Sequence, residues 1–192
     1  AERNPVFVLR RRIRELMARY GASEVLTYSF VSERLMKKAG LDVNNSYKII
    51  NSISPDLQYI RQSIVPSLLD KAYINQKIPF DKFALFEVNS VYQKEWGLTD
   101  EQVPVEKTRL GCVIAERKNN QTPYYKAKMF VTKLLEELGF DAEFLPLKKQ
   151  GAPALPFEQK RAAEIWVNNE CIGVVGEFKN SVRHNFKLAE FL

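Results

Sequence analysis

Gly21 to Phe30 reads GASEVLTYSF and comes directly after an amphipathic pattern. From Pro5 to Tyr20, apolar residues recur at a spacing of three or four, which predicts a helix with one buried face. Gly21 can end this helix, because glycine readily adopts the left-handed conformation that commonly follows a last turn. Glu24 to Phe30 then reads as a strand. A helix that leads straight into a strand is therefore the first structural unit of the chain.

The remaining pattern mixes helices and strands at irregular intervals. We expect helices over 33–39, 66–76, 123–138 and 181–186, and strands over 47–51, 82–94, 108–116, 142–145, 161–167 and 171–178. The last two strands are predicted to form a hairpin, because Asn168 and Asn169 tolerate the backbone that a tight turn needs. The irregular spacing excludes repeated parallel units. The sequence therefore predicts one α+β domain over 1–192, with a mostly antiparallel sheet flanked by helices.

Length and composition are those of an ordinary globular domain. The chain has 192 residues, of which 45% are hydrophobic and 27% charged. No apolar run approaches the roughly 20 residues that span a membrane, and no secretory signal opens the chain. The only cysteines, Cys112 and Cys171, are interpreted as reduced core thiols of a cytoplasmic protein. Because the sequence opens on Ala1 without a Met, we expect a fragment of a longer protein.

The charge balance points to an anionic partner. The net charge is +6, which favours a partner such as RNA. Basic residues of the first helix are either a solvated surface or a flank for RNA or an acidic partner: Arg10, Arg11, Arg14 and Arg19. Phe7 and Val8 lie off the main apolar stripe of that helix. The helix is therefore predicted to be covered from a second side, for example by another chain.

The residue types that catalysis requires are scarce. His184 is the only histidine, which excludes most nucleophile–base pairs. The eight glycines are scattered, and none precedes the Lys-Ser or Lys-Thr pair of a phosphate-binding loop. Glu87, at the end of an apolar strand, is the best candidate for a functional carboxylate. A structural role beside a backbone amide or a basic neighbour is the other interpretation.

Several stretches resemble one known family. Gly21 to Phe30 is similar to that family's GYQEVITYSF, and IRQSIVPSLL at Ile60 to Leu69 is similar to its pattern of Arg, a small residue, Ser, two aliphatics, Pro and two leucines. LFEV at Leu85 to Val88 resembles the family's Leu-Phe-Glu-Ile strand. The family's closing hairpin is similar to residues 161–165 and 172–177. The family is the catalytic-like module of the bacterial phenylalanyl-tRNA synthetase beta subunit. The resemblance implies a degenerate class II aminoacyl-tRNA synthetase core.

Departures from the catalytic pattern accompany this resemblance. The second class II motif falls at Phe86 to Glu95, reading FEVNSVYQKE, and Gln93 stands where catalytic members carry the Arg that clamps the α-phosphate of ATP. Loss of one such contact typically costs about 3 kcal/mol or more of transition-state stabilisation. The third motif has no convincing copy. Lys126 and Glu158-Gln159-Lys160 depart from the pattern of the beta subunit itself, so contacts made at those positions elsewhere in the family are not carried over.

The resemblance implies a partner subunit and a non-catalytic role. The partner is the alpha subunit, which carries the active site, in an assembly of two alpha and two beta subunits. That phenylalanine–tRNA ligase uses ATP and magnesium on tRNA(Phe), whereas this fragment is expected to be non-catalytic and to hold no cofactor or metal. The expected interface residues are Phe7, Leu9, Ile13, Leu16 and Tyr28. Expected structural or RNA contacts are Arg10, Arg14, Arg61, Glu87 and Arg161.

Two other functions remain open. One is a stand-alone basic RNA-binding domain, suggested by the net charge and by aromatic residues beside a basic one at Tyr124, Tyr125 and Lys126. The other is a small-molecule enzyme that uses Glu87.

Overall fold

A computed structural model of the chain describes residues 4–116, 122–148 and 151–189. Its longest feature is an antiparallel pair of strands, β4 (Lys82–Tyr92) and β5 (Glu106–Glu116), and the short β1 (Ser23–Glu24) runs parallel to β4 at its other edge. A second antiparallel sheet has the order β6 (Glu143–Pro146), β7 (Phe157–Val167) and β8 (Glu170–Phe178). A small pair joins β2 (Phe30–Val31) to β3 (Tyr59–Ile60).

The predicted α+β class with mostly antiparallel strands is confirmed. The strands nevertheless form three small sheets in the described residues, whereas the sequence was interpreted as one sheet. Strand pairing depends on contacts between distant residues, so local patterns do not reveal how strands divide among sheets.

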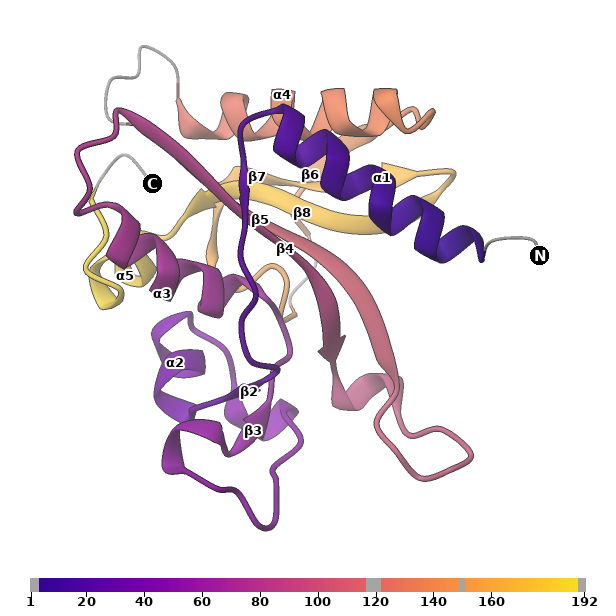
Figure 1. The fold of residues 1–192 in the computed structure, drawn as a ribbon, viewed down its shortest axis with the longest axis vertical. Coiled ribbons are helices and arrows are strands. Elements are labelled where there is room, and N and C mark those ends of the chain that lie inside the picture. The colour runs from indigo at the N-terminus through magenta and orange to yellow at the C-terminus, as the bar shows by residue number, and fades with distance from the viewer. Residues whose placement is uncertain (1–3, 117–121, 149–150, 190–192) are drawn as a thin grey trace.

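Helices cover both faces of the β4–β5 hairpin. The longer helices are α1 (Pro5–Arg19), α3 (Val65–Asn75) and α4 (Pro123–Glu137), and the shorter ones are α2 (Glu33–Lys38) and α5 (Asn180–Asn185). Successive side chains of a strand point to opposite faces. Phe86 accordingly joins a core cluster with α1 and α4, whereas Leu85 joins a cluster with α3. Figure 1 shows α1 and α4 on one side of the hairpin and α3 on the other.

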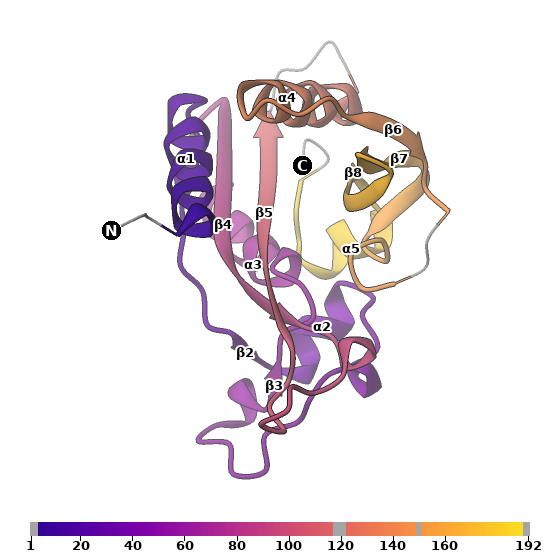
Figure 2. The ribbon, with the colours of Figure 1, turned by 90° about the vertical axis from the view of Figure 1, so that its right-hand side faces the viewer.

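Helix α4 spans two sheets. Leu134 belongs to the cluster with Phe86 of β4, whereas the next residue, Leu135, belongs to the cluster with Ala163 and Val175 of β7 and β8. Figure 2 shows α4 above the tip of β5 and beside β6, β7 and β8. The two sheets therefore share a single helical cover.

Local sequence signals correctly predicted most helix ends and the last hairpin. The side chain of Asn4 accepts a hydrogen bond from the amide of Val6 at 2.9 Å and so caps α1, and Gly21 follows the helix with a φ of 82°. Asn168 and Asn169 have φ values of 50° and 63°, which confirms the predicted turn between β7 and β8.

Two predicted strands are wrong in extent. Between β1 and β2, the chain is extended but leaves the edge of β4 after Val25 to reach β3, so residues 26–29 join no strand ladder. Within 47–51, Lys48 forms only an isolated bridge with Tyr59. Residues 26–29 cross from the sheet of β1, β4 and β5 to the β2–β3 pair, whereas 47–51 lie between β2 and β3 and bridge that pair only at Lys48.

The β7–β8 hairpin yields a prediction about packing. A Cβ at Gly176 would lie 2.4 Å from Cβ and 2.8 Å from Cα of Ala162, so Gly176→Ala requires the backbone to shift. We expect the free energy of unfolding to fall by about 1–3 kcal/mol, measured by urea denaturation. Gly173→Ala is the matched control, because its nearest atom is Cδ1 of Ile165 at an ordinary 3.6 Å. Equal unfolding midpoints for both variants would contradict the prediction.

Candidate subunit interface

Apolar side chains are exposed on the first turns of α1. Four consecutive residues are each between 43% and 64% exposed: Val6, Phe7, Val8 and Leu9. Four consecutive helical positions point in widely different directions, so one sheet cannot cover them all. The fully buried residues of α1 are Leu16 and Met17, near its other end. The amino-terminal half of α1 therefore offers an apolar surface that the described part of this chain leaves uncovered.

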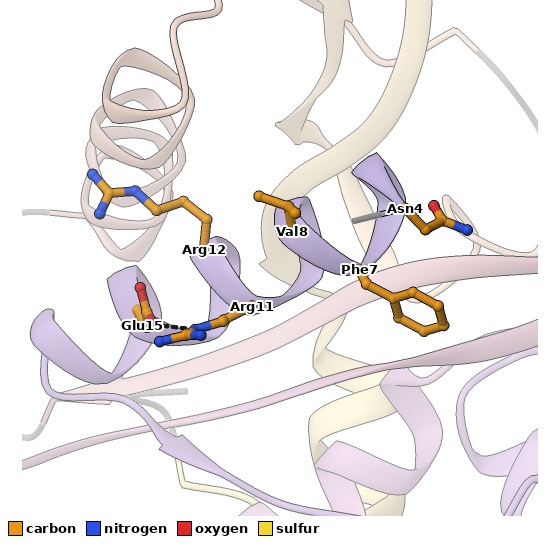
Figure 3. A pocket seen from close by; sticks show the side chains of 6 residues that line it. All are labelled: Asn4, Phe7, Val8, Arg11, Arg12 and Glu15. Carbon is orange, nitrogen blue, oxygen red and sulfur yellow. Dashed lines mark hydrogen bonds and ion pairs between the residues drawn. The ribbon is translucent and has the colours of Figure 1, made fainter. Parts of the chain in front are cut away.

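A shallow hollow lies along the same part of α1. It has a volume of about 620 Å³ and is lined by Asn4, Phe7, Val8, Arg11, Arg12 and Glu15. Figure 3 shows the ring of Phe7 projecting away from the helix and the Arg11–Glu15 ion pair one turn further on. All the lining residues belong to α1 and its cap, from Asn4 to Glu15, whereas small-molecule sites are concave and enclosed. The hollow is suited to contact with another macromolecule.

The extended chain after α1 adds a second apolar row. From Val25 to Val31 the side chains alternate, with odd-numbered residues partly or fully buried and even-numbered residues exposed. The exposed ones, which we call the outer strip, are Leu26 at 77%, Tyr28 at 76% and Phe30 at 45%. An extended segment with an apolar outward face is typical of a contact surface rather than of a solvated edge.

The predicted interface residues divide into three groups. Phe7, Leu9 and Tyr28 are exposed, and Ile13 is half-buried against the core. Leu16 has 0% exposure and packs in the cluster with Phe86, so its side chain is not available to a partner. This correction has a simple cause: helical periodicity identifies an apolar stripe but not whether the same chain or another covers it.

Two members of the outer strip were not among the interface residues predicted from the sequence. Leu26 and Phe30 belong to the run Leu-Thr-Tyr-Ser-Phe, in which apolar residues occupy every second position. That alternation was the available signal, because it places all three large side chains on one face of an extended segment.

A buried ion pair lies behind the outer strip. Arg61 is 1% exposed and Glu87 0% exposed, and both terminal guanidinium nitrogens of Arg61 donate to Oε1 of Glu87 at 3.1 Å. Nε of Arg61 donates to the carbonyl of Ser90 at 3.0 Å. Asn89 donates to Oε1 of Glu87 at 2.9 Å, and the hydroxyl of Thr27 donates to Oε2 at 2.6 Å. The carboxylate of Glu87 is thus fully occupied by neighbours, which is a structural position and not one that a substrate reaches.

Gln93 also faces inward. It is 6% exposed, and its Nε2 donates to the carbonyl of Gln62 at 3.3 Å. The amide of Gln62 in turn donates to the carbonyl of Asp42 and to Oγ of Ser46, both at 2.7 Å. Catalytic members of the class carry an ATP-clamping Arg at this position. Here it is occupied by a neutral side chain that is buried and hydrogen-bonded within the chain.

The thiol of Cys112 is also unreactive. Burial raises the pKa of the Cys112 thiol to about 12, so this group stays protonated at neutral pH and is a poor nucleophile or metal ligand. Across residues 4–116, 122–148 and 151–189, no three or more His, Cys, Asp or Glu side chains are grouped so that they could hold a metal ion. No helix in that part of the chain is long and apolar enough to cross a membrane.

The basic residues singled out for RNA contact have partners within the chain. Arg10 donates to the hydroxyl of Thr108, and Arg14 pairs with Glu24 at 2.6 Å. The other ion pairs of this set are Arg61 with Glu87, Lys126 with Glu116, and Arg161 with Glu177. These pairs reduce the positive charge that the same residues could offer to a phosphate backbone.

The arrangement of strands and helices matches a solved synthetase. A pyrrolysyl tRNA synthetase from Desulfitobacterium hafniense, PylSc, aligns with 97% of this chain and 63% of its own, with a TM-score of 0.70 and 13% sequence identity. The fold is therefore that of the class II aminoacyl-tRNA synthetases.

Sequence comparison narrows this class. The model of the phenylalanyl tRNA synthetase beta chain CLM domain matches residues 1–192, and the chain belongs to that family. Curated phenylalanine–tRNA ligase beta subunits are similar: that of Geobacillus kaustophilus is 26% identical over 97% of this chain and 23% of its own length, and that of Oceanobacillus iheyensis is 29% identical over 95% and 23%. The subunit of Zymomonas mobilis is 32% identical over 71% of this chain. The chain spans less than a quarter of the length of these relatives.

Proposed function

We propose that this chain is a non-catalytic core module of a phenylalanine–tRNA ligase beta subunit, and that it holds the catalytic alpha subunit through α1 and the outer strip. The observation that carries the proposal is the apolar outward face of an extended segment, Leu26, Tyr28 and Phe30, which follows the end of α1. The exposed apolar residues at the start of α1 add to it. A beta subunit is by its name one part of an assembly, and the curated relatives carry that name. In this proposal the module acts in the cytoplasm within two alpha and two beta subunits.

The absence of catalysis in this module is part of the proposal. Gln93 replaces the phosphate-clamping Arg and is turned into the core, and Glu87 is neutralised by Arg61. Binding of ATP, magnesium and tRNA(Phe) is assigned to the holoenzyme, with the chemistry on the alpha subunit. Calorimetry of the purified chain with ATP and phenylalanine should give no binding heat, and a saturable heat with ATP would overturn this part.

Tyr28→Asp in the full-length beta subunit tests the interface. A charge at the centre of a desolvated contact removes the apolar contribution of the tyrosine ring and buries an unpaired carboxylate. Substitution of an interface hot-spot residue typically costs at least about 2 kcal/mol of binding free energy. We therefore expect the dissociation constant for the alpha subunit to rise at least about 30-fold, measured by a titration followed by mass photometry.

Tyr125→Asp is the control for this measurement. Tyr125 is 62% exposed on α4, similar to the 76% of Tyr28, but lies outside the outer strip. Its substitution should leave assembly unchanged. Wild-type affinity for the Tyr28→Asp subunit, or equal weakening by both variants, would refute the proposed interface.

A further inference from the structure

The middle of the outer strip has little backbone support. The amide of Val25 donates to the carbonyl of Phe86 at 2.9 Å, and the carbonyl of Ser29 accepts from the amide of Arg61 at 2.9 Å. Between these two bonds, the main chain of residues 26–28 makes no hydrogen bond within the described parts of the chain. This stretch contains Leu26 and Tyr28, the two most exposed members of the outer strip. Figure 1 shows it as the thin indigo-to-violet trace from the end of α1 towards β2.

A side chain supplies the support that the backbone lacks. Oγ1 of Thr27 accepts a hydrogen bond from Nη1 of Arg61 at 2.9 Å and donates one to Oε2 of Glu87 at 2.6 Å. Hydrogen bonds to charged groups contribute about twice as much as neutral ones. Both charged partners are buried, and Arg61 is itself fixed by its bond to the carbonyl of Ser90. Thr27 is therefore anchored to a rigid point inside the core.

We propose that Thr27 is a positioning residue for the interface: its hydroxyl ties the unpaired middle of the segment to the Arg61–Glu87 pair, so that Leu26 and Tyr28 are held outward together. The inference rests on the proposed function of the outer strip. Threonine suits this role because its branched Cβ restricts χ1, and the direction of its hydroxyl is thereby limited. A segment that is already ordered binds its partner without the entropic cost of ordering it on contact.

Thr27→Val isolates the hydroxyl. Valine keeps the shape of threonine but can neither accept from Arg61 nor donate to Glu87, whereas Thr27→Ser keeps both functions. Affinity falls in proportion to the fraction of molecules in the binding-competent conformation. We expect Thr27→Val in the full-length beta subunit to weaken association with the alpha subunit about 10-fold, the effect of reducing that fraction to about a tenth, and Thr27→Ser to restore it.

Amide hydrogen exchange separates positioning from general stability. The amides of Val25 and Arg61, which bracket the segment, should lose protection in Thr27→Val, whereas the amide of Val113 in the β4–β5 ladder should not. Loss of protection at Val113 as well would contradict the proposal, because the hydroxyl would then support the whole core.

Asn89→Ala is the matched control. It also removes one donor from the carboxylate of Glu87, at 2.9 Å, but it leaves the segment untouched. Its association should equal that of the wild type. If Asn89→Ala weakens assembly as much as Thr27→Val, or if Thr27→Val binds like the wild type while Tyr28→Asp does not, the positioning role fails and the interface stands. If Tyr28→Asp leaves assembly intact, the proposed function itself fails.

Discussion

Arg61→Met is expected to lower the free energy of unfolding by about 3–5 kcal/mol. The substitution leaves the carboxylate of Glu87 fully buried without its counter-charge, and the carbonyl of Ser90 loses its donor. Removal of one partner from a buried pair is far more damaging than removal of both, because an uncompensated charge remains in a medium that solvates it poorly. The urea midpoint of the purified chain measures the effect.

Two further variants test that reasoning. Arg61→Met combined with Glu87→Leu replaces the pair by apolar groups and should recover most of the loss. Arg11→Met removes one partner of the exposed Arg11–Glu15 pair, whose side chains are 73% and 47% exposed, and should leave the midpoint unchanged. A double variant less stable than Arg61→Met alone would show that the buried charge is not the source of the loss.

Phe86→Ala is expected to have an effect of similar size, about 3–5 kcal/mol. Phe86 is 1% exposed and belongs to the cluster that joins β4 to α1 through Leu16 and Met17 and to α4 through Leu134. Truncation removes the transfer free energy of the ring and leaves a cavity where three elements meet. Because two helices and a strand line that space, collapse around it requires several elements to move together.

Thermal and urea unfolding of Phe86→Ala and Phe80→Ala give the comparison. Phe80 is 58% exposed, so its truncation should change the free energy of unfolding by no more than about 0.5 kcal/mol. A Phe86→Ala variant as stable as Phe80→Ala would mean that the cluster is plastic enough to refill the space.

The parts of the fold that the sequence predicted are those with local causes. Helix α1 begins after a capping Asn4 and ends before Gly21, and the β7–β8 turn depends on two adjacent asparagines with positive φ. The division into three sheets, the isolated bridge at Lys48 and the double role of α4 depend on contacts between residues far apart in the chain. No short-range pattern encodes such contacts.

In the candidate site, too, local patterns were predictable from the sequence and contacts between distant residues were not. Tyr28 was predicted as an interface residue through a family resemblance and is exposed, and period-two alternation could have added Leu26 and Phe30 to that prediction. Leu16 was assigned to the subunit interface although the core of this chain buries it, because an apolar stripe looks the same whichever chain covers it. Arg61 and Glu87 were both singled out, but their separation of 26 positions hid the pairing, which only the fold reveals.

The outward alternation of Leu26, Tyr28 and Phe30 also affects the protein before assembly. In a copy of the protein without a partner, these apolar side chains and the unpaired main chain of residues 26–28 are exposed to solvent. Exposed apolar edges with unpaired backbone groups are templates for self-association. In the proposed assembly the alpha subunit covers this edge. We therefore expect a copy without its partner to aggregate more readily than the assembled protein.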